Sequence, residues 1–421
     1  MSNIPELRFQ EFSEEWEEKK YENIYSFYTT NSLSRDKLNY KKGEVYNIHY
    51  GDIHTKFSTI FKLESEKVPF INSEIDLSKV KADSYCQVGD LVIADASEDY
   101  NDIGKTIEIL SLNNKKTLAG LHTFLARPNK YDVSLGYMGY MLQSWTIRKQ
   151  IMTIAQGTKV LSLSTGRLSQ IKLNLPQKPE QQKIASFLTS VDKKIEQLTQ
   201  KEQLLQEYKK GVMQKIFSGE IRFKDDDGNE FPEWESFRLG EITKFRRGSF
   251  PQPYGLSKWY DQKDGLPFVQ VFDVDDNMKL KAVTKNKISK LAQPLSVFVK
   301  EDSIVLTIQG SIGRIALTQY DAYVDRTLLI FTDYLRTINK KFFIYVVFLL
   351  FEIEKRKAPG GTIKTITKET LTSFLVNLPC IEEQTKIANF LSSIDKKLEL
   401  LSKQIEEIKE FKKGLLQKMF V

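Results

Sequence analysis

Residues 180–217 read EQQKIASFLTSVDKKIEQLTQKEQLLQEYKKGVMQKIF, and this stretch occurs twice in the chain. A second stretch, at residues 383–420, reads EQTKIANFLSSIDKKLELLSKQIEEIKEFKKGLLQKMF. The two copies lie 203 residues apart and align without a gap. When residues 174–218 are compared with residues 377–421, 23 of 45 positions are identical. A repeat at so long a period indicates two copies of one large unit rather than a solenoid of short repeats.

Apolar residues in each copy are spaced alternately four and three positions apart. This spacing places them on one face of a helix, as the a and d positions of a heptad repeat do, and it continues for about five heptads. We therefore predict a long helix in each copy, with an apolar seam that faces a partner helix. The predicted seam consists of Ile184, Leu188, Val191, Ile195, Leu198 and Leu205 in the first copy and Ile387, Leu391, Ile394, Leu398, Leu401, Ile405 and Ile408 in the second.

Two matched lysines, Lys209 and Lys412, interrupt this seam. They could fix the register of the helix pair, because a polar residue at a seam position specifies which residues face each other. They could also extend their charged ends to water beside Tyr208 and Phe411. The sequence leaves both interpretations open.

Gly211 and Gly414 are compatible with two different positions for the end of each helix. Each glycine could end its helix, or could lie within it and allow a neighbour to approach closely. The apolar spacing continues beyond both glycines, and one internal glycine costs only about 1 kcal/mol, so we favour continuous helices. Each would then be about 55 Å long at a rise of 1.5 Å per residue.

The composition sets limits on the kind of protein. With 421 residues the chain can form two or more domains with hydrophobic cores. The two cysteines provide no disulfide framework, which favours the reducing cytoplasm. The longest apolar run, at residues 342–351, is too short to span a bilayer, and the N-terminus lacks the layout of a signal peptide. The net charge of +7 is compatible with a nucleic-acid partner without establishing one.

The regions before the two repeated stretches follow one plan. A leading segment with the pattern apolar-Arg-Phe occurs at residues 7–9 and again at residues 221–223. Strands are predicted at residues 44–48, 90–94, 105–110 and 123–126, and again at 266–274, 303–307, 314–318 and 327–331. A helix follows each set, at residues 135–154 and 339–357. The glycine-rich residues 310–313 are expected to form a strand-to-strand turn.

These patterns predict an α/β (α+β) protein with two similar globular domains, each followed by a long helix. The first domain with its leading segment occupies residues 1–176, and the first long helix occupies residues 177–218. The second domain with its leading segment occupies residues 219–379, and the C-terminal long helix occupies residues 380–421.

No motif in the sequence indicates catalysis. There are three histidines, no Cys-x-x-Cys pair, no phosphate-binding loop and no G-x-S-x-G elbow. The Asn-Pro-Pro-Tyr type of tetrapeptide that adenine methyltransferases use is also absent. We therefore predict a chain that is not an enzyme and has no metal site or cofactor of its own. Scattered carboxylates leave a DNA nuclease open as the alternative, and a helical scaffold without a nucleic-acid role is a third possibility.

The pattern Leu-Pro-x-x-x-Glu-Gln-x-Lys-Ile-Ala-x-Phe-Leu begins at Leu175 and again at Leu378, and each copy leads into a helix that ends Lys-Lys-Gly-x-x-Gln-Lys-x-Phe. This doubled set resembles the specificity subunit of type I restriction–modification systems. Residues 103–104 and 157–158 with Trp16, and residues 312–313 and 361–362 with Trp234, fit the recognition domains of that family. The resemblance covers essentially the whole chain, in the order of the family.

The resemblance implies a non-catalytic subunit that reads DNA. Its two domains would be target recognition domains, each reading one part of a split site in double-stranded DNA. The helices would pair as an intramolecular antiparallel coiled coil that sets the distance between the half-sites, at most about 16 base pairs for 55 Å at 3.4 Å per step. Two methyltransferase subunits and the restriction/translocase subunits would be its partners. S-adenosylmethionine, ATP and Mg²⁺ would be bound by those partners, and no membrane would be involved.

Recognition of DNA needs Lys and Arg side chains at phosphates and polar side chains such as Arg, Gln, Asn or Ser at base edges. In the second domain the best candidate segment is residues 244–255, which combines paired arginines with a glycine- and proline-containing loop. The candidates there are Arg246, Arg247, Ser249, Gln252, Tyr254, Gln309, Ser311, Arg314, Arg326 and Lys364, of which Arg246 and Arg247 are the strongest.

The first domain offers fewer cations at the corresponding places. Its candidates are Thr30, Asn31, Lys56, Tyr100, His122 and Lys159. Each candidate in either domain could instead be a solvated surface side chain. His122 could also be a hydrogen-bonded residue of the core.

Overall fold

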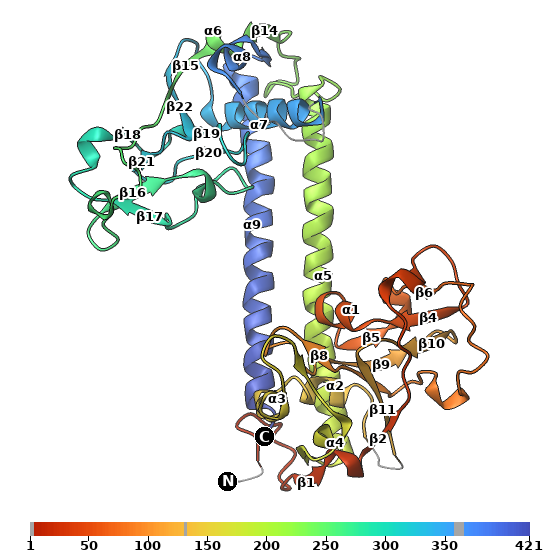
Figure 1. Ribbon diagram of the computed structural model, residues 1–421. Coiled ribbons are helices and arrows are strands. Elements are labelled where there is room, and N and C mark those ends of the chain that lie inside the picture. Colours follow the sequence, from red (N-terminus) through yellow and green to blue (C-terminus); the bar gives the residue numbers. More distant parts are fainter. Residues whose placement is uncertain (1–3, 130–132, 358–365) are drawn as a thin grey trace. The chain divides into compact units, whose positions relative to one another are not determined.

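A computed structural model describes residues 4–129, 133–357 and 366–421 (Figure 1). The chain divides into two compact units. One unit consists of Met1–Gln200 and Ser402–Val421, and the other of Lys201–Leu401. Each unit therefore contains one globular domain, the first half of the long helix that follows that domain, and the second half of the other long helix. No helix in these described ranges is long and apolar enough to cross a membrane.

The two long helices are continuous. Helix α5 spans Lys178–Phe217 and helix α9 spans Ile381–Lys418, so both pass through the glycines at which they could have ended (Figure 1). A Cβ atom at Gly211 or Gly414 would meet no heavy atom of the described chain within 4 Å. Among the described residues, therefore, none approaches these glycines closely, and both lie in open parts of the helix surface.

Within each unit the two helix halves run antiparallel. In the first unit Lys412 of α9 forms an ion pair with Asp192 of α5 at 2.6 Å. In the second unit Lys209 of α5 forms an ion pair with Asp395 of α9 at 2.5 Å. The two aspartates are equivalent under the sequence repeat, and so are the two lysines. Both units therefore use one antiparallel register.

A tyrosine from the globular domain completes each ion pair. Tyr140 donates a hydrogen bond to Asp192 at 2.8 Å, and its ring centroid lies 5.3 Å from the Lys412 Nζ. Tyr345 donates to Asp395 at 2.5 Å and lies 5.4 Å from the Lys209 Nζ. The two lysine side chains are only 18% and 16% exposed. Of the two interpretations of these lysines, the structure supports the one in which they fix the register.

All thirteen residues of the predicted seam are buried or half-buried. The seam does more than join two helices, because its apolar residues also contact the domains. Leu188 and Tyr137 belong to one buried cluster in the first unit, and Leu391 and Phe342 belong to one in the second. The helices therefore form part of the hydrophobic core of each unit.

The repeated Glu-Gln pair anchors each leading segment and each domain to its helix. Glu180 accepts two hydrogen bonds from Arg8, at 2.8 and 2.7 Å, and Glu383 accepts two from Arg222, both at 2.9 Å. The side chain of Gln181 bonds the carbonyl of Pro176 at 2.9 Å and the backbone N–H of Ser134 at 3.0 Å. These contacts explain the spacing of the Leu-Pro-x-x-x-Glu-Gln motif.

The first domain contains one five-stranded and one four-stranded sheet, in the orders β2-β11-β7-β9-β5 and β10-β4-β6-β3, and two two-stranded sheets, β1-β13 and β12-β8. Its elements are β1 (Glu17–Lys20), β2 (Tyr25–Tyr28), β3 (Leu38–Asn39), β4 (Val45–Ile48), α1 (Tyr50–Thr55), β5 (Ile60–Lys62), β6 (Phe70–Ile71), β7 (Leu91–Ala94), β8 (Ala96–Ser97), β9 (Thr106–Ser111), β10 (Lys116–Ala119), β11 (Thr123–Pro128), α2 (Tyr137–Met141), α3 (Trp145–Ile154), β12 (Leu161–Ser162), α4 (Thr165–Leu168) and β13 (Lys172–Leu175).

The second domain contains two four-stranded sheets, in the orders β15-β22-β19-β20 and β17-β16-β21-β18, and the two-stranded sheet β14-β23. Its elements are β14 (Glu235–Arg238), α6 (Leu239–Ile242), β15 (Thr243–Arg247), β16 (Leu266–Val269), β17 (Asn286–Ile288), β18 (Val297–Val299), β19 (Ile304–Thr307), β20 (Ile315–Leu317), β21 (Ala322–Val324), β22 (Leu328–Tyr334), α7 (Lys340–Lys357), α8 (Lys368–Ser373) and β23 (Leu375–Leu378). The mixed α/β fold class with two repeated domains and two long helices is confirmed.

Two predicted elements differ from the structure. The strand predicted at 266–274 ends at Val269, because the Asp273 carboxylate accepts hydrogen bonds from the backbone N–H groups of Gln270 and Lys285, both at 2.9 Å, and turns the chain. The helix predicted at 135–154 is two helices, α2 and α3. Ser144 between them has an extended backbone with ψ of 148°, which ends the first helix and begins the second without a capping hydrogen bond from its hydroxyl.

The repeated Ile-Gly pair has a structural cause in both domains. Gly104 and Gly313 have φ of +69° and +88°, in the left-handed region that favours glycine. A Cβ atom at either position would lie 2.6 Å from a side-chain atom of the helix above it, Ile151 in α3 and Phe351 in α7. Glycine is therefore required for both the turn and the close packing of the helix on the sheet.

Candidate nucleic-acid interface

The sheet topology of the second domain gathers the predicted DNA contacts at one edge. Strands β15, β22, β19 and β20 are neighbours in that order, and each neighbouring pair is antiparallel. The ends of β15 and β19 and the starts of β22 and β20 therefore lie at the same edge of the sheet. The residues that lie at these strand ends, or in the loops beside them, are Arg247, Gln309, Ser311, Arg314 and Arg326.

Arg246 and Arg247 line a groove at this edge. The groove has a volume of about 680 Å³ and is also lined by Gln309 and Gly310, with apolar side chains that include Ile308. Within the described ranges neither guanidinium makes a hydrogen bond or an ion pair. The two arginines are thus exposed cations beside a polar amide, which is the kind of surface that can bind phosphates and base edges.

Arg326 lies next to this groove and is supported by an aromatic ring. Its guanidinium carbon is 5.5 Å from the ring centroid of Tyr254. The Tyr254 hydroxyl donates to Asp325 at 2.7 Å and accepts from Gln270 at 2.7 Å. Burial, together with Asp325, raises the pKa of Tyr254 well above its usual range. Tyr254 therefore holds Arg326 in place, and we do not include its hydroxyl among the proposed DNA contacts.

Several other candidates in this domain bond to the protein itself. Arg314 forms an ion pair with Asp276 at 2.9 Å, and the Ser249 hydroxyl donates to the carbonyl of Leu295 at 3.0 Å. Gln252 and Ser311 are exposed. Lys364 lies outside the described residues. The proposed contacts of this domain are accordingly Arg246, Arg247, Arg326 and Gln309, together with the exposed Gln252 and Ser311.

The first domain places its candidates at the matching edge. Strands β2, β11, β7 and β9 are also antiparallel neighbours. Thr30 and Asn31 follow β2, Tyr100 lies between β7 and β9, and His122 precedes β11. Residues far apart in the sequence are thus brought to one edge in both domains.

Some polar side chains at this edge already form hydrogen bonds within the protein, and others are available to bind a ligand. The Asn31 amide donates to Asn47 at 2.7 Å and to the Ala119 carbonyl at 2.9 Å, and its oxygen accepts from the Leu33 N–H at 3.1 Å. Both N–H donors of its amide are thus engaged and none is left for a phosphate oxygen, so we leave Asn31 out of the proposed phosphate contacts. Thr30 donates to the Thr123 carbonyl at 3.1 Å.

His122, Tyr100 and Lys159 remain available at the surface. The His122 side chain is 50% exposed and is therefore no core residue; its Nδ1 lies 3.3 Å from an Asp95 carboxylate oxygen. Tyr100 is 54% exposed, and Lys159 is exposed as well. These three side chains stay in the proposed interface.

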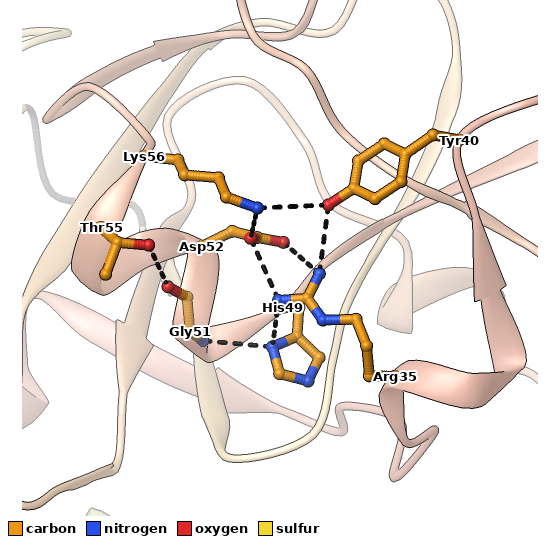
Figure 2. A network of polar contacts seen from close by, with 7 residues as sticks. All are labelled: Arg35, Tyr40, His49, Gly51, Asp52, Thr55 and Lys56. Carbon is orange, nitrogen blue, oxygen red and sulfur yellow. Dashed lines mark hydrogen bonds and ion pairs between the residues drawn. The ribbon is translucent and has the colours of Figure 1, made fainter. Parts of the chain in front are cut away.

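Lys56 lies in a polar network that the sequence did not reveal (Figure 2). Its ammonium group is 2.7 Å from a carboxylate oxygen of Asp52, which also accepts two hydrogen bonds from Arg35. Arg35, Tyr40 and His49 join this network through tertiary contacts. No periodicity or motif marks them, so only the folded chain identifies the group.

A family of known proteins matches this chain in two segments, one for each globular domain. Residues 10–207 and 232–410 match the model of the type I restriction modification DNA specificity domain. The chain belongs to this family. It carries two DNA specificity domains, which is the architecture that the repeated sequence predicts.

Individual members of the family extend the likeness over the whole chain. A protein of Methanocaldococcus jannaschii named as the MjaX type I restriction enzyme specificity subunit is 25% identical over 98% of this chain and 95% of its own length. The EcoBI specificity subunit of Escherichia coli is 25% identical over 58% of this chain and 56% of its own. The crystal structure of a type I restriction-modification S subunit from M. genitalium superposes with a TM-score of 0.58 at 15% identity, covering 99% of both chains, and so shares the fold.

Neither the fold nor these comparisons support the nuclease alternative. Among the described residues, no group of three or more His, Cys, Asp and Glu side chains is arranged as a metal site would require. The proteins that this chain resembles are named for specificity, not for catalysis.

Proposed function

We propose that this chain is the DNA-recognition subunit of a type I restriction–modification complex and that it reads a split site in double-stranded DNA. The observation that carries this proposal is the coincidence of two specificity-domain matches with two sheets that expose candidate contacts at the same edge. Each domain would read one half of the site. Lysines and arginines would bind phosphates, and Arg247 and Gln309 would contact base edges.

The paired helices would set the gap between the half-sites. Support comes from their continuity through both glycines and from the repeated ion pairs, Asp192 with Lys412 and Asp395 with Lys209, which fix one antiparallel register. A rigid pair of helices is suited to hold two reading domains at one separation.

The outer faces of the helices would bind two copies of a methyltransferase subunit. Tyr208 and Phe411, which are equivalent under the repeat, are 54% and 55% exposed. Because the repeat places these two side chains at equivalent positions, two copies of one partner could contact them in the same way. Restriction/translocase subunits would complete the complex, in the cytoplasm where chromosomal DNA lies. S-adenosylmethionine, ATP and Mg²⁺ would be bound by the partner subunits.

Methylation mapping tests this function directly. The chain should be co-expressed with its cognate methyltransferase subunit in a host that lacks adenine methylation, and methylated adenines should be mapped across the genome. We expect one split motif with a fixed gap, and no such motif when the chain is omitted. Scattered methylation, or an uninterrupted motif, would contradict a two-domain reader. Cleavage of DNA by the purified chain with Mg²⁺ alone would contradict a non-catalytic role.

Replacing Arg247 with alanine is expected to weaken binding to the cognate site by about 1–3 kcal/mol and to relax the sequence choice at one position, because a bidentate contact to a base would be lost. Affinity should be measured by fluorescence anisotropy at one fixed salt concentration, alongside methylation mapping. Arg238→Ala is the matched control, since Arg238 is exposed in the same domain but lies on β14, away from the edge. Unchanged affinity and unchanged sequence choice would remove Arg247 from the interface.

A further inference from the structure

In the network around Asp52, two cations bind one buried carboxylate, and both cations also donate to one tyrosine hydroxyl (Figure 2). Asp52 lies in α1 and is fully buried. It accepts hydrogen bonds from Arg35 at 2.6 and 3.0 Å and pairs with Lys56 at 2.7 Å. The Tyr40 hydroxyl oxygen accepts from Arg35 at 3.2 Å and from Lys56 at 3.5 Å.

The network carries one net positive charge. Burial on its own would raise the pKa of the Asp52 carboxyl, but the hydrogen bonds from Arg35 and Lys56 outweigh it and hold that pKa below its ordinary value. Burial, and next the Arg35 charge, lower the pKa of His49 to about 4, so this ring is neutral near pH 7. Its Nδ1 accepts from the Gly51 N–H at 3.1 Å. Two cations and one carboxylate therefore remain.

Hydrogen-bond donors on the outer side of the network lack an acceptor. Both groups that bond the Tyr40 oxygen are donors only, so the Tyr40 O–H must point elsewhere. Tyr40 is 42% exposed and the Lys56 side chain is 53% exposed. Neither the Tyr40 O–H nor the third N–H of Lys56 meets an acceptor in the part of the chain that the structure describes. Arg35, in contrast, uses its terminal nitrogens on Asp52, Tyr40 and His49.

This donor surface borders the candidate interface of the first domain. The ring of Tyr50 lies 4.7 Å from that of His49 and 5.3 Å from that of His122. His122 is at the sheet edge where the predicted contacts gather. The ammonium group of Lys67 lies 5.4 Å from the Tyr40 ring centroid and adds a further positive charge. The rings of His49, Tyr50 and His122 therefore connect the network to this edge.

We propose that Tyr40 and Lys56 form a phosphodiester-binding site for the DNA backbone, with Arg35 and Asp52 as positioning residues. A phosphodiester carries one negative charge and offers only acceptor atoms, so it complements a donor surface of charge +1. Such a contact adds affinity and fixes the position of the duplex, and it does not read sequence. This inference rests on the proposed DNA-reading function and adds a contact site to the first domain.

The test compares the full-length wild type with Lys56→Met and Tyr40→Phe for binding to a duplex of arbitrary sequence, because non-specific binding reports phosphate contacts. Lys56→Met should make the slope of log affinity against log salt shallower by about one. Tyr40→Phe should weaken binding about 3- to 10-fold without changing that slope, since it removes a hydrogen bond and no charge. Lys149→Met, which removes an exposed lysine on α3, should change neither quantity. Thermal unfolding of each variant checks that it folds.

The outcomes test the phosphodiester-binding site and the proposed function separately. If the wild type binds duplex DNA and both variants bind with the same affinity and slope, the phosphodiester site is wrong and the proposed function stands. If the wild type shows no salt-dependent duplex binding, both are wrong. A final experiment adds inorganic phosphate at constant ionic strength. If phosphate at low millimolar concentration raises the unfolding temperature of the wild type but not of Lys56→Met, while both bind DNA with the same affinity and slope, the site binds free phosphate and its assignment to DNA is overturned.

Discussion

Replacing Arg8 with alanine is expected to lower the free energy of unfolding of the first unit by about 3–5 kcal/mol, because it leaves a buried carboxylate without its cation. Glu180, whose side chain is 2% exposed, accepts both of its hydrogen bonds to the leading segment from Arg8. The nearby Trp16 Nε1 is buried and has no partner among the described residues, so it gives Glu180 no replacement bond. Unfolding by urea, with hydrogen exchange to identify the unit that opens, measures the effect.

The second unit supplies the matched comparison. Arg222→Ala should cost less than Arg8→Ala, because the Trp234 Nε1 still donates to Glu383 at 3.0 Å after the arginine is removed. Replacing both partners, as Arg8→Met with Glu180→Gln, should recover much of the loss, since no unpaired charge then stays buried. A loss below about 1 kcal/mol for Arg8→Ala would show that the pair behaves like an exposed one.

These contacts also show why so much of the fold could be predicted. The seam spacing, the repeated strands and the Glu-Gln motif are local patterns, and each copy repeats the other, so the sequence specified both domains and both helices. The break at Ser144 could not be predicted, because residues 135–154 have helical spacing throughout. The end of β16 depends on the bonds that Asp273 accepts, and one of these comes from Lys285, twelve residues away.

The sequence indicated which loops carry the candidate site, but not which of their side chains are available to bind DNA. Loops beside strand ends indicated Arg247, Gln309 and Arg326, and the antiparallel sheet brings them to one edge. Whether a polar side chain is free or bonded to the chain itself depends on tertiary contacts. For that reason the sequence could not indicate that the Asn31 amide donates to Asn47 and Ala119, or that the Tyr40 hydroxyl accepts from two cations.

Removing one heptad from each long helix should shorten the gap of the recognised site and leave its two halves unchanged. The deletions would be residues 199–205 in α5 and the equivalent residues 402–408 in α9. Both lie between the residues of the repeated ion pairs, so the pairs of Asp192 with Lys412 and of Lys209 with Asp395 can still form. Seven residues correspond to about 10 Å of helix, or about three base pairs of DNA.

Methylation mapping measures the gap directly, because the gap separates the two halves of the methylated motif. The original site should no longer be methylated, and a site with the same halves and a gap shorter by about three base pairs should replace it. Removing two residues from each helix is the control, since two residues rotate the rest of the helix by about 200°, turn the seam away from its partner and should abolish methylation. An unchanged gap in the heptad variant would mean that the helices do not set the spacing, and the spacer role would have to be assigned to the contacts with the partner subunits.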